Sequence, residues 1–235
     1  MSAITTTPDV GATLTAVIAA ITAIGGLGVA AAGLVDATKA FGGGVSNFGF
    51  GRIEAALKPF QAALVLAESN WAATIRANWI NGAPKEDQKA AAKSLIRLGL
   101  SSDNADAMAK AGHVDAAKLK LVLTAIETGA ALTPDQVNLL GRFNAAIDAA
   151  MDGGFEQADQ QYRNASKLLS GVAAIGLAVW GGDLLHGGSF PDYVGSADFG
   201  KAFLVGIIAV PLAPVAKDLT SSLQAAVTAL KAVKG

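Results

Sequence analysis

The sequence contains no cysteine among its 235 residues and only two histidines. The absence of cysteine excludes a disulfide framework, a thiolate nucleophile and a cysteine-based zinc cluster. His113 and His186 lie far apart, and neither belongs to a His-x-x-Glu or Glu-x-x-His pair. A Gly-x-Ser-x-Gly nucleophile motif is also missing. We therefore predict no catalytic residue, no metal site, no cofactor and a protein that is not an enzyme.

Charge is scarce as well. Charged residues make up 16% of the chain against about a quarter in soluble domains, and the net charge is −1. The segment from Arg52 to Lys167 contains thirteen basic and thirteen acidic residues, and the basic residues form no cluster. A nucleic-acid-binding surface needs such a cluster, so we expect no nucleic-acid partner. A helix-turn-helix interpretation of Ser102 to Ile126 is disfavoured for the same reason.

Apolar residues, by contrast, are abundant, and they gather in long runs. Val10 to Val35 contains no charged residue and would extend about 39 Å as a helix, more than the roughly 30 Å thickness of a bilayer core. The alternative is a cleaved signal peptide, but no Lys or Arg precedes the run and the run is too long for an h-region. We expect it to stay as a first transmembrane helix. Gly26 with Ala30 and Gly28 with Ala32 are candidate helix-packing residues because small side chains four residues apart permit close helix approach.

Two more apolar segments follow near the end of the chain. They cover Leu168 to Leu185 and Ala202 to Ala216, and the loop between them contains Gly, Ser, Pro and Asp. Their arrangement predicts a membrane hairpin, although segments of fifteen to eighteen residues are also typical of buried core helices. Lys217 to Gly235 has apolar residues on one side, which predicts an amphipathic helix.

The material between the first and second runs is polar enough for water and predicts helices only. A glycine- and phenylalanine-rich stretch, Ala40 to Gly51, predicts a hinge. Trp71, Ile75 and Trp79 share one face of a helix expected over 60–80 and are predicted core residues. A capping box at Thr133 to Gln136 starts a helix that we expect to end at Met151, before Gly153 and Gly154.

The sequence therefore predicts an all-α integral membrane protein with about three transmembrane helices and a helical soluble domain between the first and second. The predicted parts are a short outside tail (1–9), the first transmembrane helix (10–35), a hinge (36–51), a cytoplasmic helical domain (52–167), the second transmembrane helix (168–185), an outside loop (186–201), the third transmembrane helix (202–216) and a C-terminal amphipathic helix (217–235).

The orientation follows from the positive charges beside each span. The N-terminal tail and residues 183–200 contain no Lys or Arg, whereas Lys39, Lys167 and Lys217 lie next to the opposite ends of the spans. Because positive charge stays on the cytoplasmic side, the N-terminus is expected outside and the middle domain and C-terminus inside. We expect a bacterial inner membrane protein whose partners are the lipid bilayer and either copies of itself or other subunits of a membrane complex.

One ionisable pair marks a candidate ion or proton site. Asp183 and His186 are three residues apart at the predicted mouth of the second span, so they share a helix face. Ionisable groups at such a position bind cations or pass protons in some membrane proteins. The alternative is that both residues only end the helix at the headgroup boundary.

Three functional hypotheses remain. The first is a non-enzymatic oligomeric scaffold or accessory subunit of a membrane complex. The second is an ion-conducting component, because the order of an outside N-terminus, one span, a cytoplasmic domain and a span pair is similar to the ExbB, TolQ and MotA stator family. That family lines its last two spans with hydroxyl residues, whereas here only Ser170 occurs in them. The third is a soluble helical protein that inserts an apolar hairpin as a pore, in the manner of colicin-like toxins.

Overall fold

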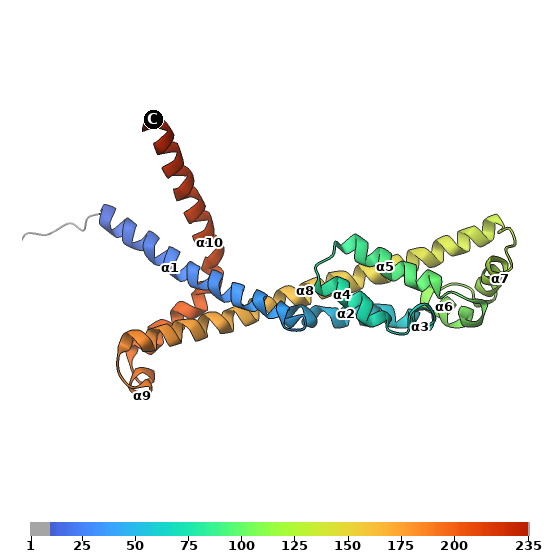
Figure 1. Cartoon of the computed structure of the whole chain (residues 1–235), viewed down its shortest axis with the longest axis horizontal. Coiled ribbons are helices and arrows are strands. Elements are labelled where there is room, and N and C mark those ends of the chain that lie inside the picture. The colour runs from blue at the N-terminus through green and yellow to red at the C-terminus, as the bar shows by residue number, and fades with distance from the viewer. Residues whose placement is uncertain (1–9, 235) are drawn as a thin grey trace, which may run out of the picture. The chain divides into compact units, whose positions relative to one another are not determined.

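The chain is all-α in the part that its computed structural model describes, residues 10–234, where no strand occurs (Figure 1). Side-chain burial is described for residues 15–222, 224 and 225. The predicted outside tail, 1–9, and most of the apolar side chains of the amphipathic segment 217–235 lie outside these ranges. The predicted all-α fold class is confirmed.

The α-helices are α1 (Val10–Ala37), α2 (Asn47–Leu57), α3 (Gln61–Ala67), α4 (Trp71–Ile80), α5 (Lys85–Leu98), α6 (Ala105–Gly112), α7 (Ala116–Glu127), α8 (Pro134–His186), α9 (Phe190–Val194) and α10 (Ala197–Lys234). Short 3-10 helices cover Thr38–Ala40, Gly44–Ser46, Lys58–Phe60 and Ser102–Asn104.

The helices form two compact units, which we describe separately. The membrane unit consists of residues 1–44 and 165–235, and the helical unit consists of residues 45–164. The long helix α8 contributes its first part to the helical unit and its last part to the membrane unit.

Three helices of the described chain are long and apolar enough to cross a membrane, in agreement with the prediction. They are α1, α8 and α10, with candidate spans that fall within residues 15–40, 134–186 and 197–222. Together with the absence of strands among the described residues, this finding is consistent with a membrane protein. The apolar part of α8 lies in the membrane unit.

Small residues let the helices of the membrane unit approach one another closely. Gly28 lies directly against the backbone of Ala209 in α10, so a β-carbon at Gly28 would overlap the Ala209 carbonyl. Ala31, Ala174 and Ala209 are fully buried and join α1, α8 and α10 in one small core. This core contains few large side chains, so it depends on close backbone approach.

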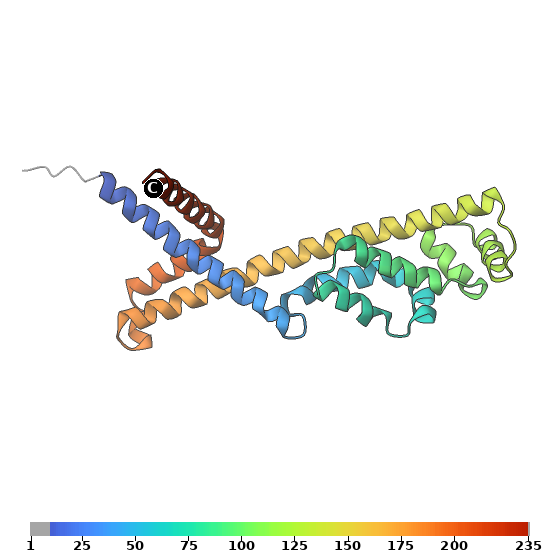
Figure 2. The same cartoon turned by 45° about the horizontal axis from the view of Figure 1, so that its top comes forward.

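Helix α10 runs through two prolines and differs here from the sequence-based expectation of separate elements over 202–216 and 217–235. Pro211 and Pro214 both lie inside the helix. Each proline removes a backbone donor and bends the helix, and Figures 1 and 2 show α10 changing direction along its length.

The helical unit has a conventional apolar core. Its largest fully buried side chains include Phe60, Leu64, Ile96, Leu123 and Phe143. The rings of Phe60 and Phe143 meet edge to face with centroids 6.3 Å apart. Twenty buried residues form one continuous cluster, which is enough for a domain with its own hydrophobic core.

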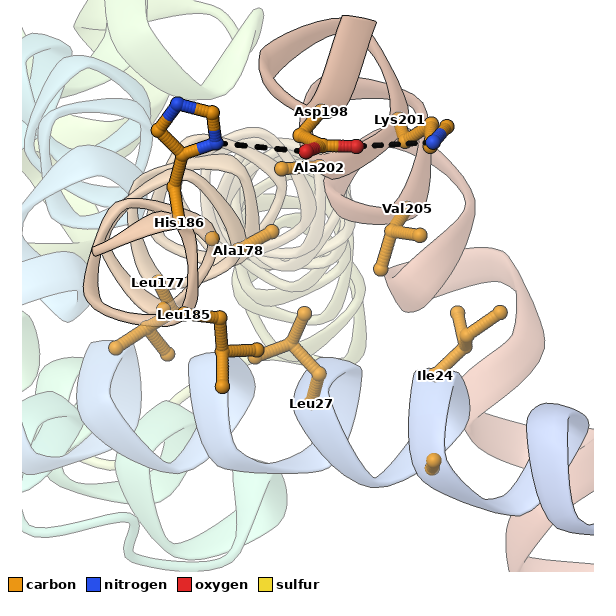
Figure 3. A pocket seen from close by; sticks show the side chains of 13 residues that line it. Ile24, Leu27, Leu177, Ala178, Leu185, His186, Asp198, Lys201, Ala202 and Val205 are labelled. Atoms are coloured by element: carbon orange, nitrogen blue, oxygen red, sulfur yellow. Dashed lines mark hydrogen bonds and ion pairs between the residues drawn. The ribbon is translucent and has the colours of Figure 1, made fainter. Parts of the chain in front are cut away.

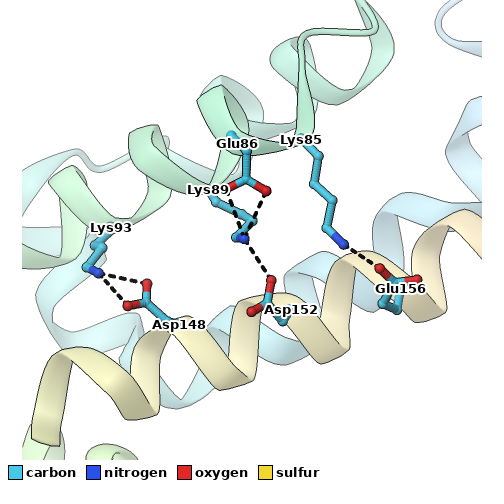
Figure 4. A network of polar contacts seen from close by, with 7 residues as sticks. All are labelled: Lys85, Glu86, Lys89, Lys93, Asp148, Asp152 and Glu156. Carbon is cyan, nitrogen blue, oxygen red and sulfur yellow. Dashed lines mark hydrogen bonds and ion pairs between the residues drawn. The ribbon is translucent and has the colours of Figure 1, made fainter.

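A ladder of polar contacts joins α5 to α8 within the helical unit (Figure 4). Lys93 Nζ lies 2.6 Å from Asp148 Oδ2, and Lys89 Nζ lies 2.7 Å from Asp152 Oδ1. Lys85 Nζ and Glu156 Oε1 form the next rung at 2.5 Å. Arg97 extends the ladder by donating from Nη2 to Asn144 Oδ1 at 3.1 Å. All partners recur every four residues, so the two helices run antiparallel with matched faces.

The electrostatic surroundings in this unit shift the pKa values of Lys89 and Glu127, among others. Hydrogen bonds to Asp152, and then to Glu86, raise the pKa of the Lys89 ammonium above its ordinary value. The backbone N–H of Ser102 donates to Glu127 at 2.7 Å and lowers the pKa of that carboxyl. Glu127 is exposed, so its contact orients a surface side chain more than it stabilises the fold, whereas the Lys89 side chain is only 16% exposed.

Several predicted boundaries differ from the structure. The expected helix over 60–80 is divided into α3 and α4, with Glu68 extended between them. In the predicted hinge, α2 already begins at Asn47. The expected end before Gly153 and Gly154 is wrong, because α8 continues through both glycines. Gly154 faces Ala56 so closely that a β-carbon would overlap it, so tertiary packing of α2 on α8 overrides the local helix-breaking tendency of glycine.

The predicted aromatic stripe belongs to the core. Trp71 and Ile75 are buried, and Trp79 is half-buried. The indole Nε1 of Trp79 donates to the Ser46 carbonyl at 2.8 Å, and its ring contacts those of Phe155 and Tyr162.

Candidate functional site

Polar and ionisable side chains of the membrane unit gather at the turn between α8 and α10. Helix α8 ends at His186, and Gly187 adopts the left-handed conformation, with φ of 72°, that glycine adopts without a steric cost. Ser189 accepts a hydrogen bond from the backbone N–H of Asp192 and caps α9. Ser196 Oγ accepts from the backbone N–H of Asp198 at 3.2 Å and starts α10. These local hydrogen bonds at the helix ends thus reverse the direction of the chain between α8 and α10.

Tyr193 is the centre of this turn. Its side chain is fully buried, and its ring contacts His186, Phe190 and Phe199 at centroid distances of 5.5, 6.3 and 5.7 Å. Gly182 on α8 leaves room for the Tyr193 hydroxyl, which has no hydrogen-bond partner among the described residues. Burial raises the pKa of the Tyr193 phenol, and the carboxylates of Asp183 and Asp198 raise it further.

Three charged or ionisable side chains, His186, Asp198 and Lys201, meet where α8 ends and α10 begins (Figure 3). Asp198 Oδ2 lies 3.4 Å from His186 Nδ1, and Asp198 Oδ1 lies 2.9 Å from Lys201 Nζ. The His186 side chain is 25% exposed, that of Asp198 53% and that of Lys201 75%. The carboxylate of Asp198 therefore has one permanent cationic partner and a second partner that is charged only when its imidazole is protonated.

These side chains line one end of a cavity of about 590 Å³ that lies within the membrane unit. Figure 3 shows Ile24 and Leu27 of α1 on the side of the cavity opposite His186 and Asp198. The other lining residues are small or apolar residues of all three helices: Ala23, Leu177, Ala178, Gly181, Gly182, Leu185, Ala202 and Val205. The cavity is thus amphipathic, with charge at one end and apolar walls elsewhere.

The structure changes the partner expected for His186. The sequence suggested a pair of Asp183 with His186, whereas the imidazole lies beside Asp198 of α10. Asp183 remains close enough to influence Tyr193. The sequence reasoning missed Tyr193, Asp198 and Lys201. The pattern Ser196-x-Asp198 followed by Lys201 is a helix-start signal, but it carries no information about contact with α8.

The three side chains can bind a proton or an ionic group. Among the described residues that line the cavity, His186, Asp198 and Lys201 are charged or ionisable and none has a hydroxyl side chain. Over the described part of the chain, no group of three or more His, Cys, Asp or Glu side chains is placed to hold a metal ion.

The four candidate helix-packing residues have different surroundings. Gly28 is buried against α10 and serves packing inside the chain. Gly26, Ala30 and Ala32 are exposed, and a β-carbon at Gly26 would meet no atom within 4 Å. The exposed residues of this set are therefore open to a partner helix.

Comparisons of the chain with protein-family models, with curated proteins and with solved structures give no match. The function must therefore be inferred from the physical features of the chain itself.

Proposed function

We propose that the chain is a non-enzymatic integral membrane protein that acts as an oligomeric scaffold or as an accessory subunit of a membrane complex. The observation that carries this proposal is the uncovered apolar surface of the candidate spans. In the most apolar window of α1, α8 and α10, only 17%, 17% and 22% of the residues are buried inside the chain. The remaining surface needs lipid or protein to cover it.

The exposed face of α1 supports assembly with a second protein. Gly26 and Ala30 lie four residues apart and are both exposed, and Gly33 adds a third small residue with open space around it. Small residues at such spacing allow two helix backbones to approach within van der Waals contact, which stabilises association in lipid. Apolar side chains flank this face, including Val29 and Leu34.

The helical unit supports a role in assembly on the water-facing side. It has its own core, and its exposed surface includes apolar side chains that a solitary domain does not require, among them Leu66, Leu98 and Leu121, which are 65%, 73% and 64% exposed. A balanced set of acidic and basic residues accompanies them. Such a mixed surface suits protein contacts better than contacts with a polyanion.

The first test measures membrane retention and mass in the same sample. We expect the full chain to stay in the membrane pellet after alkaline carbonate extraction and to show the mass of more than one chain by light scattering in mild detergent. Gly26→Leu should weaken the association roughly tenfold, because the larger side chain separates the helices. Gly176→Leu on α8 is the matched control, since Gly176 also has open space around it.

Two results would contradict the proposal. Release of the unaltered protein into the carbonate supernatant would contradict permanent membrane insertion and would favour the pore-forming alternative. A single-chain mass for both the unaltered protein and Gly26→Leu would contradict the oligomeric scaffold.

We also propose that the helical unit and the C-terminus lie in the cytoplasm of a bacterium and that the turn between α8 and α10 lies outside. Because the chain has no cysteine, single introduced cysteines report accessibility without background. In intact cells, a membrane-impermeant maleimide should label Phe190→Cys and should label Ala130→Cys only after lysis. Both positions are exposed. The reverse pattern would invert the orientation, and labelling of both in intact cells would refute it.

A further inference from the structure

The cavity of the membrane unit has the same polarity pattern as a membrane lipid. Its charged end is formed where α8 ends and α10 begins, by His186, Asp198 and Lys201. Its walls are apolar and come from three helices that are able to cross a bilayer. A molecule that fits both ends needs a polar headgroup and a hydrocarbon chain.

The charges at this end match a zwitterionic headgroup. Asp198 and Lys201 present one carboxylate and one ammonium side by side, at 2.9 Å, and both side chains are at least half exposed. A headgroup with one ammonium and one phosphate can engage both groups at once. An anionic headgroup would meet Lys201 but would be repelled by Asp198 and by Asp183, which lies one helical turn before His186.

The hydrogen-bonding capacity of the Asp198 carboxylate distinguishes between two zwitterionic headgroups, ethanolamine and choline. The ammonium of ethanolamine has three N–H donors, whereas the quaternary ammonium of choline has none. Asp198 accepts hydrogen bonds, and a charge-assisted hydrogen bond is stronger than charge proximity alone. An aromatic cage that would favour choline is not among the lining residues.

We propose that this cavity binds one molecule of phosphatidylethanolamine. The ammonium lies on Asp198, the phosphate lies on Lys201, and part of one acyl chain lies between Leu27 and Leu177. This inference requires only that the chain resides in a membrane, so it stands even if the assembly role proposed above fails.

The test is native mass spectrometry of the full chain released from detergent. Phosphatidylethanolamine, phosphatidylcholine and phosphatidylglycerol with identical acyl chains are added in equal amounts. We expect a single ethanolamine-lipid adduct that exceeds each of the other adducts by about tenfold, as expected for one additional charge-assisted hydrogen bond. Equal adducts of the three lipids would show unspecific surface lipid and would overturn the proposal.

Two variants locate the site. Gly181→Leu places a side chain in the cavity without a clash at its β-carbon, and it should lower the ethanolamine-lipid adduct about tenfold. Gly176→Leu makes the same change on the same helix outside the cavity and should leave the adduct unchanged. An identical adduct for these two variants would overturn the proposal.

Asp198→Asn keeps the test valid if Gly181→Leu does not fold. Asp198→Asn should bring the ratio of ethanolamine lipid to choline lipid close to one, because the charge that favours the N–H donors is removed. Asp218→Asn, an exposed carboxylate on the same helix away from the cavity, should leave the ratio unchanged. A ratio that does not change in Asp198→Asn would refute the assigned headgroup contact.

Discussion

Replacement of Gly28 with leucine is expected to disrupt the membrane unit, whereas the same change at Gly26 leaves its internal packing intact. Gly28 lies against the Ala209 carbonyl, and a β-carbon there would overlap backbone atoms of α10. Backbone cannot move aside as a flexible side chain can, so α1 must separate from α10. Overpacking of this kind costs about 1–3 kcal/mol or more. Gly26 faces open space, and a β-carbon at this position meets no atom of the chain within 4 Å.

The measurement is the thermal stability of the full chain in detergent, followed by size-exclusion chromatography of heated samples. Gly28→Leu should lose its monodisperse peak at a lower temperature than the unaltered protein, and Gly26→Leu should not. Gly28→Ala is informative too, because its single β-carbon already produces the overlap. Unchanged stability in Gly28→Ala and Gly28→Leu would show that α1 does not pack on α10 through this residue.

The second large effect is expected from Phe143→Ala in the helical unit. The Phe143 ring is 1% exposed, meets the Phe60 ring edge to face and lies directly under Gly112. Removal of a buried phenylalanine ring leaves a cavity and costs about 3–5 kcal/mol. Because natural domains have only about 5–15 kcal/mol of stability, this change should partly unfold the helical unit.

Amide hydrogen exchange of the full chain measures this effect locally. Amides of α6 and of the N-terminal part of α8 should lose protection in Phe143→Ala. Leu98→Ala is the control, since Leu98 is 73% exposed and its removal leaves no cavity. Equal protection in the two variants would mean that the contact between Phe60 and Phe143 contributes little to this core.

The fold class was predictable because its signals are local. An uncharged run longer than a bilayer core defines α1 from its composition alone, and the structure confirms three helices of the described chain that can span a membrane. The capping box at Thr133 is also present, with Thr133 N donating to Gln136 Oε1 at 2.9 Å. Such signals involve neighbours in sequence, so no knowledge of tertiary contacts is needed.

The candidate site was only partly predictable because its contacts are not local. His186 and Asp183 share a helix face, which suggested a pair, but the partner of His186 is Asp198 on the next long helix. The contact exists because Gly187, Ser189 and Ser196 fold the turn in a particular way. The continuity of α8 through Gly153 and Gly154 has a similar origin, since close packing with Ala56 compensates for a local preference against helix.

The charges of the polar ladder between α5 and α8 repeat every four residues along both helices, so the same pairing of opposite charges is possible at more than one alignment. If α5 slid by one helical turn, Lys89 would face Glu156, Lys93 would face Asp152, and Arg97 would face Asp148. Opposite charges would still meet after this slip, so the ladder selects an antiparallel direction but not a unique alignment. Two other features hold α5 at one position within the helical unit: Gly99, which follows α5, lies directly against the Ala63 carbonyl of α3, and Ile96 is fully buried. The ion pairs alone therefore permit alignments that differ by one helical turn, and close packing around Gly99 and Ile96 favours one of them.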